Sequence, residues 1–214
     1  MSATNRRRAI RAVAPVAGLL AAGLLVWQGS YAAFSATTSN TADAWDTGTL
    51  ALQNNGGTAT YAGTTSALFA GLTAGQPENN IKIGSTGTKC ITVESTGSLA
   101  GSLKLYRGTI SGTNSALLAP QISLTVDAGT VAAATNVAAN CTGFPASGTT
   151  SIASGVALSA LPSTYAAAPG FAVATGTQRV AYRITWTVTS TGSNPGDNAL
   201  QNSSAVADLT WEIQ

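Results

Sequence analysis

The clearest pattern along the chain is the alternation of apolar and polar residues over residues 178–190. One set of alternate positions carries β-branched or aromatic side chains, and the other carries mainly Thr and Arg. This period of two predicts a half-buried strand. Residues 205–213 alternate in the same way. The two segments supply the predicted core residues: Val180, Tyr182, Ile184, Trp186, Val188, Leu209, Trp211 and Ile213.

Shorter alternating runs precede these two strands, at residues 89–95, 99–107, 121–127 and 152–158. Residues 96–98 join the first two runs in a predicted β-hairpin. Asn194-Pro195-Gly196-Asp197 predicts a turn. A short strand is expected near Cys141 and one helical turn at residues 158–161. Many short strands with no long helical period predict an all-β fold, an antiparallel β-sandwich.

The first 32 residues have a different pattern. Four arginines among residues 6–11 precede an uncharged apolar run at residues 12–27, and Ser30 and Ala32 form a small-x-small exit. This order is typical of a secretory signal-peptide helix, with signal peptidase expected to cut between Ala32 and Ala33. A permanent membrane anchor is the alternative, but a span needs about 20 apolar residues and this run has 16. Cleavage would leave residues 33–214 as one domain, with residues 33–46 as an N-terminal arm.

Cleavage also changes the sign of the net charge. Four of the ten Lys and Arg residues leave with the signal and all eight acids remain, so the charge falls from +2 to −2. The six remaining cations are scattered along the chain, and no basic patch exists to neutralise phosphates. Nucleic acid is therefore excluded as a partner. Low charge also leaves self-association weakly opposed by repulsion.

The two cysteines, Cys90 and Cys141, both fall in the exported part of the chain. Outside the cell, a pair of cysteines predicts a disulfide. A metal site or a catalytic thiol is the competing interpretation, and it lacks any histidine to assist it.

Few residues of the chain are candidates for a catalytic role. The chain has no histidine, which excludes a His-Glu-x-x-His zinc site, a Ser-His-Asp triad and a Cys-His pair. The acids are dispersed, and we expect those on strands to occupy solvated polar faces: Glu94, Asp127, Asp208 and Glu212. Residues 43–46 lack the ligand density of a calcium loop. The sequence thus predicts a protein that is not an enzyme and has no cofactor or metal.

The most specific motif follows the expected cleavage point. Tyr31-Ala32-Ala33-Phe34-Ser35 leads into a polar stretch, then Trp45, then Gly48-Thr49-Leu50-Ala51-Leu52. Over about forty residues this resembles the TasA/camelysin family, secreted bacterial surface and biofilm-matrix proteins handled by a SipW-type signal peptidase. Ala36 stands where the family commonly has Asp. The resemblance implies a jelly-roll-like sandwich, and its metallopeptidase description cannot be carried over without histidine.

The resemblance also implies assembly into fibres, in which an N-terminal segment of one subunit adds a strand to the next. Residues 33–40 are the candidate donor, with Phe34 as the apolar anchor and Ser35, Thr37 and Thr38 beside it. We therefore expect a secreted, non-enzymatic protein of the cell surface or extracellular matrix that self-associates. A glycan-binding module is the alternative, through aromatic residues outside the predicted core: Tyr61, Tyr106, Phe144, Tyr165 and Phe171.

Overall fold

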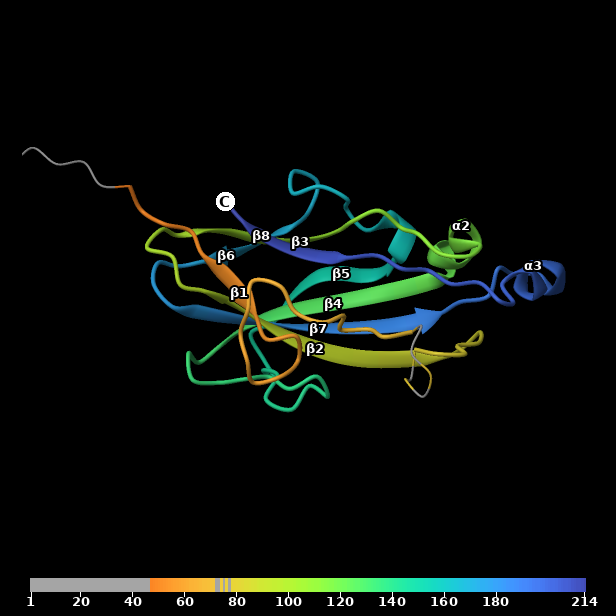
Figure 1. Cartoon of the computed structure of the whole chain (residues 1–214), viewed down its shortest axis with the longest axis horizontal. Coiled ribbons are helices and arrows are strands. Elements are labelled where there is room, and N and C mark those ends of the chain that lie inside the picture. Colours follow the sequence, from red (N-terminus) through yellow and green to blue (C-terminus); the bar gives the residue numbers. More distant parts are fainter. Residues whose placement is uncertain (1–46, 72–73, 75, 77) are drawn as a thin grey trace, which may run out of the picture. The chain divides into compact units, whose positions relative to one another are not determined.

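The computed structural model describes residues 47–71, 74, 76 and 78–214. The chain divides into two compact units, Met1–Asp46 and Thr47–Gln214, and every described residue belongs to the second. The expected signal, the Ala32–Ala33 cleavage site and the donor segment therefore lie outside the described residues. The second unit contains two antiparallel sheets and few helices (Figure 1), which confirms the all-β prediction.

The larger sheet has five strands in the order β1-β2-β7-β4-β5. Their bounds are β1 Leu52–Asn54, β2 Thr86–Ser95, β7 Gln178–Val188, β4 Ile122–Val131 and β5 Thr150–Ala157. The strand with the clearest alternation, β7, lies at the centre and pairs in long registers with β2 and β4. The register between β4 and β5 shifts near Val126, as expected where an edge strand carries a bulge.

The smaller sheet has three strands in the order β6-β3-β8. Their bounds are β6 Gly170–Val173, β3 Gly101–Arg107 and β8 Leu209–Ile213. The predicted hairpin over residues 96–98 is wrong, because β2 and β3 belong to different sheets. Both sides of β2 are already paired, with β1 and β7, so the turn instead carries the chain across the sandwich. A predicted turn alone does not show whether the next strand joins the same sheet or the opposite one.

Within the described part of the chain, four short helices join the strands: α2 Ser115–Leu118, η1 Ala119–Gln121, η2 Leu158–Ala160 and α3 Asn194–Ala199. The helical turn expected at residues 158–161 is confirmed by η2. The turn predicted at residues 194–197 is instead the start of α3, because Ser193 caps it by accepting a hydrogen bond from Gly196 N and Pro195 occupies its first turn. These features favour a helix start. The strand expected near Cys141 is absent, since Cys141 has a left-handed φ of 68° in a turn.

The main core lies between the two sheets. Six of the eight residues expected there are buried, and the other two, Leu209 and Trp211, are half-buried and pack against the same cluster. The Trp211 ring meets the Tyr182 ring edge-on, with 5.7 Å between their centroids and 65° between their planes. Aromatic pairs of this geometry stabilise a core beyond simple area burial.

A second layer covers part of the outer face of the larger sheet. We call residues 132–144 the cover. Two hydrogen bonds join the cover to β2. Val137 N donates to Thr92 Oγ1 at 3.2 Å, and Cys90 N donates to the Ala139 carbonyl at 3.0 Å. Val137 is fully buried against Cys90 and Ala181. The predicted polar face of β2 is therefore not solvated at this end of the strand.

Candidate functional site

The disulfide prediction is confirmed. Cys90 on β2 and Cys141 in the cover are bonded, with 4.9 Å between their Cα atoms and a sequence separation of 51. Cys90 is fully buried, and the structure contains no free cysteine among its described residues. The pair therefore fastens the cover to the sheet.

The carboxylates expected on solvated faces are mostly paired. Glu94 is only 6% exposed, because Arg179 Nε lies 2.6 Å from its carboxylate and Gln53 donates to it at 2.6 Å. The prediction that Glu94 is solvated is wrong, since the cover and the Tyr61 ring shield the Arg179 side chain. Asp127 pairs with Arg183 at 2.7 Å.

Glu212 accepts a hydrogen bond from the Tyr106 hydroxyl at 2.7 Å. This bond raises the pKa of Tyr106 and lowers the pKa of Glu212. Among the described residues, no group of three or more His, Cys, Asp or Glu side chains could hold a metal ion. The acidic side chains thus act as partners for cations and hydroxyls.

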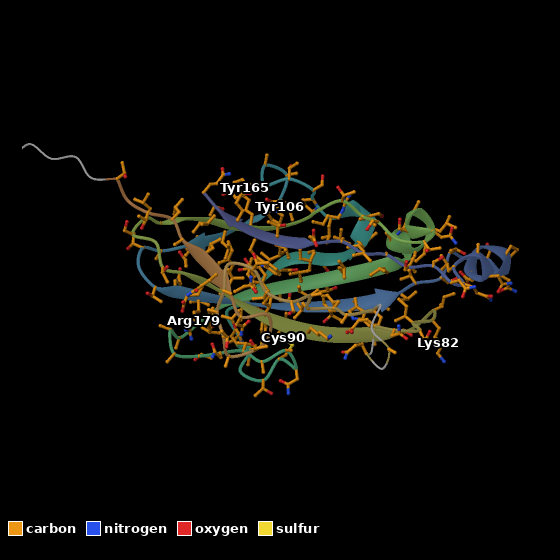
Figure 2. The ribbon with its side chains drawn as sticks, viewed as in Figure 1. Lys82, Cys90, Tyr106, Tyr165 and Arg179 are labelled. Carbon is orange, nitrogen blue, oxygen red and sulfur yellow. A yellow bond between two sulfur atoms is a disulfide. The ribbon has the colours of Figure 1, made fainter. Side chains whose placement is uncertain are left out.

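The five aromatic residues considered for glycan binding are all half-buried. Three lie under cations: Tyr61 under Arg179, Tyr165 under Lys104 and Phe144 under Arg183, at 4.4 to 4.7 Å from the ring centroids. Figure 2 shows Tyr106 and Tyr165 on the side of the smaller sheet, away from Arg179 and Cys90. These rings form no common exposed platform, so no specific observation favours a glycan site built from them.

The free edge of β8 offers a different kind of site. Ser102 and Gln214 exchange backbone hydrogen bonds, and Gly108 N donates to Asp208 O at 2.9 Å. The directly bonded pairs between β3 and β8 therefore fall at even-numbered residues. The backbone N–H and C=O groups of Leu209, Trp211 and Ile213 consequently point away from β3. Within the described residues, no backbone or side-chain partner reaches them.

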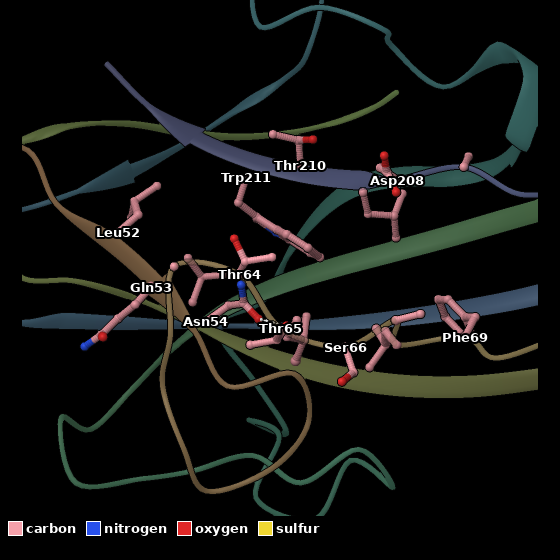
Figure 3. A pocket seen from close by; sticks show the side chains of 17 residues that line it. Leu52, Gln53, Asn54, Thr64, Thr65, Ser66, Phe69, Asp208, Thr210 and Trp211 are labelled. Carbon is pink, nitrogen blue, oxygen red and sulfur yellow. Dashed lines mark hydrogen bonds between the residues drawn. The ribbon is translucent and has the colours of Figure 1, made fainter. Parts of the chain in front are cut away.

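A groove of about 490 Å³ lies beside this edge. The edge strands β1 and β8 form two of its sides, and it reaches Ile91 and Val93 on the inner face of β2. Figure 3 shows Trp211 and Asp208 on one side, with Asn54, Thr65 and Phe69 on the other. The indole Nε1 of Trp211 is buried without a hydrogen-bond partner among the described residues. The groove thus combines walls of mixed apolar and polar side chains with an unpaired backbone edge.

The other sheet edges are less suited to accept a strand. β1 has three residues and β6 has four. β5 has eight residues, but it is bulged against β4 and contains Gly155 with φ of 63°. Bulges and short lengths are the usual protection of edge strands. Among the described edge strands, β8 is the one that has five residues in a regular ladder and a groove beside its free edge.

Sequence reasoning placed Leu209, Trp211 and Ile213 in the core, and their side chains do pack there, with Leu209 and Trp211 half-buried where the core meets the groove. It identified neither the groove nor the opposite wall, which comes from residues 63–69. The available signal was Leu68 and Phe69, two large apolar residues in a stretch of small ones that has no strand period. The four donor candidates, Phe34, Ser35, Thr37 and Thr38, lie outside the described residues.

Comparison with known proteins adds no family to this picture: no family model and no curated protein matches the chain. None of the helices among the described residues has the length and apolarity that crossing a membrane requires. The candidate site therefore stands on its own geometry.

Proposed function

We propose that this chain is an exported, non-enzymatic protein of the cell surface or extracellular matrix, and that copies of it associate by strand addition. In this proposal the sandwich is jelly-roll-like, signal peptidase cuts between Ala32 and Ala33, and residues 33–40 of one copy lie along β8 of the next. The single observation that carries the proposal is the unpaired β8 edge beside a groove that is partly lined by apolar side chains.

The chemistry of the donor segment fits this edge. In an extended strand, Phe34, Ala36 and Thr38 point to one side and Ser35, Thr37 and Ser39 to the other. The edge offers the outward backbone groups of three alternate β8 residues, so a five-residue strand is long enough to pair with all of them. Phe34 would then enter the groove near Trp211, and Ser35, Thr37 and Ser39 would face solvent.

Length also permits the connection. Six residues, 41–46, separate the donor segment from Thr47, the first described residue. Fully extended, they span at most about 20 Å. A linker of this length keeps neighbouring copies close while the donor lies in another copy's groove. Backbone hydrogen bonds provide the affinity in such a contact, and the groove provides selection for the side chains.

The buried disulfide supports an oxidising location for the folded chain, since disulfides persist mainly outside the cytosol. N-terminal sequencing of the protein from culture supernatant tests export directly. The expected first residue is Ala33. Recovery of the intact chain from the cytosol or the membrane would contradict this part of the proposal.

Assembly is tested with the exported protein and a variant that lacks residues 33–40. We expect concentration-dependent assembly of the parent, followed by light scattering and electron microscopy, and none of the variant. A peptide of residues 33–40 should inhibit the parent, whereas the same peptide with Phe34→Asp should not. Unchanged assembly after the deletion would overturn strand addition.

A further inference from the structure

One wall of the groove comes from the segment of residues 63–70, which we call the strap. Gly63 to Phe69 line the groove opposite β8. Figure 3 shows Thr64, Thr65 and Ser66 on the lower side of the groove, facing Trp211 and Asp208 above. The strap therefore borders the space that a strand paired with β8 would need.

Few bonds hold the strap. Its N-terminal neighbour Ala62 is fixed by two backbone hydrogen bonds to Asn54, of 2.8 and 2.9 Å. At the other end, the Gly71 carbonyl accepts from Asn79 Nδ2 at 2.8 Å. Between these anchors, no backbone–backbone hydrogen bond joins residues 63–70 to the described residues. Segments whose backbone is not hydrogen-bonded open at low free-energy cost.

Two features keep the strap in place. The Thr65 hydroxyl donates to Asn54 Oδ1 at 2.6 Å. Leu68 and Phe69 are half-buried against the main core, and Lys89 Nζ lies 5.7 Å from the centre of the Phe69 ring. The strap is thus held in place by one side-chain hydrogen bond and by the packing of two apolar side chains.

Resting on the proposed function, we propose that the strap closes the β8 groove in a single copy and must swing out before a strand can be added. The strap and the outer edge of β8 border the same groove. Among the described residues, neither backbone forms hydrogen bonds on the side of the groove, and the two are not hydrogen-bonded to each other. An incoming strand would pair with β8 and replace the apolar contacts of Leu68 and Phe69. Opening of the strap then limits the rate of assembly.

A loosening variant tests the proposal first. Thr65→Val keeps the side-chain volume but removes the hydroxyl that donates to Asn54. The acceptor is not orphaned, because Asn54 Oδ1 also accepts from Gly56 N at 3.0 Å. Losing one hydrogen bond should speed strap opening by about two- to tenfold. Thr60→Val is the matched control: it makes the same chemical change just before the strap and outside the groove lining, and among the described residues the Thr60 hydroxyl makes no hydrogen bond.

A tightening variant tests the opposite direction. A Cβ atom built at Gly56 lies 2.9 Å from Thr65 Cβ, and disulfides need about 3.5–4.5 Å. Small adjustments would therefore let Gly56→Cys with Thr65→Cys link the strap to the turn below it. Gly56→Ser with Thr65→Ser is the control, because it carries the same left-handed strain at φ of 54° without a crosslink.

Two measurements decide the outcome. Chymotrypsin cleavage after Leu68 and Phe69, which are half-buried in the closed strap, should be faster in Thr65→Val by the same factor, with β2 and β7 left uncut. Assembly of the exported protein should then speed up by the same two- to tenfold and stop in the crosslinked variant. If the cleavage rate changes but the assembly rate does not, the strap proposal is overturned, while deletion of residues 33–40 still tests strand addition independently. If the parent chain itself fails to assemble, both proposals fall.

Discussion

The two faces of the larger sheet are built in different ways, although the same strands carry both. The inner face of β7 packs Val180, Tyr182, Ile184, Trp186 and Val188 into one apolar cluster. The outer face changes along the strand. At one end the cover hides it, and at the other end Thr185 and Thr187 remain partly exposed beside the hydroxyls of β2.

The covered end is held by polar groups that satisfy one another. Asn55 is fully buried, and its amide donates to the carbonyls of Thr58 and Val137 while its oxygen accepts from Thr92 N and Gly57 N. A buried polar group is tolerated when it is hydrogen-bonded in this way. The inner face is therefore specified by apolar area, and the outer face by a few long-range contacts.

Of the changes considered, removal of the disulfide should lower the free energy of unfolding the most. In a Cys90→Ala, Cys141→Ala variant, the lost loop-closure constraint over a separation of 51 residues should lower the free energy of unfolding by about 4 kcal/mol. Denaturant unfolding measures this change. The parent chain after reduction is the control and should behave alike. A loss below about 1 kcal/mol would mean that the hydrogen bonds hold the cover unaided.

A cavity introduced into the inner face should cause the second largest loss of stability. Ile184 is 1% exposed, so Ile184→Ala should lower the free energy of unfolding by about 3 kcal/mol. Its neighbour Thr185 points to the outer face, and Thr185→Ala should change stability by about 0.5 kcal/mol or less. Chemical denaturation of the two variants compares adjacent residues on opposite faces. Equal losses would contradict the assignment of the two faces.

Much of the inner face could be predicted from the sequence, and little of the outer one. Alternation in residues 178–190 depends only on the period of a strand, so it marks which side chains share a face. It does not identify what covers the other face. Glu94 looked solvated because its ion-pair partner, Arg179, is 85 residues away. The hairpin at residues 96–98 failed for the same reason, since strand order depends on distant pairings.

The candidate site shows the same limit. Leu209, Trp211 and Ile213 alternate as core residues do, and the structure places their side chains toward the core. Their unpaired backbone is a property of sheet order, which places β8 at an edge. No local pattern encodes that position. The strap was equally hidden, because a segment without secondary-structure period gives no sign of what it packs against.

Breaking the buried ion pair should have an intermediate effect. Glu94→Gln leaves Arg179 without its carboxylate in a site where the two side chains are 8% and 15% exposed, which should cost about 2 kcal/mol. Asp127→Asn is the matched control, because its pair with Arg183 is more open, with side chains 21% and 42% exposed. We expect about 1 kcal/mol or less there. Similar losses in thermal or chemical unfolding would show that burial does not distinguish the pairs.

The smallest effect at neutral pH should come from a buried hydroxyl on the inner face. The Tyr182 hydroxyl has no hydrogen-bond partner among the described residues, so Tyr182→Phe should change stability by about 1 kcal/mol at most. Burial raises the pKa of Tyr182 well above its usual value of 10.0. The folded state therefore retains this proton longer than the unfolded chain, and its contribution to stability is present below pH 10 and lost as the pH rises above it.

Alkaline unfolding should thus be delayed in Tyr182→Phe relative to the parent. Burial also raises the pKa of Tyr61 in the outer layer, but the nearby Arg179 guanidinium opposes this shift. Tyr61→Phe should therefore delay alkaline unfolding less than Tyr182→Phe does. Unfolding followed by circular dichroism between pH 9 and about pH 12 compares the two variants. If alkaline unfolding is delayed more in Tyr61→Phe than in Tyr182→Phe, the tyrosine of the outer layer is the more strongly desolvated of the two. That result would contradict the proposed difference between the two faces.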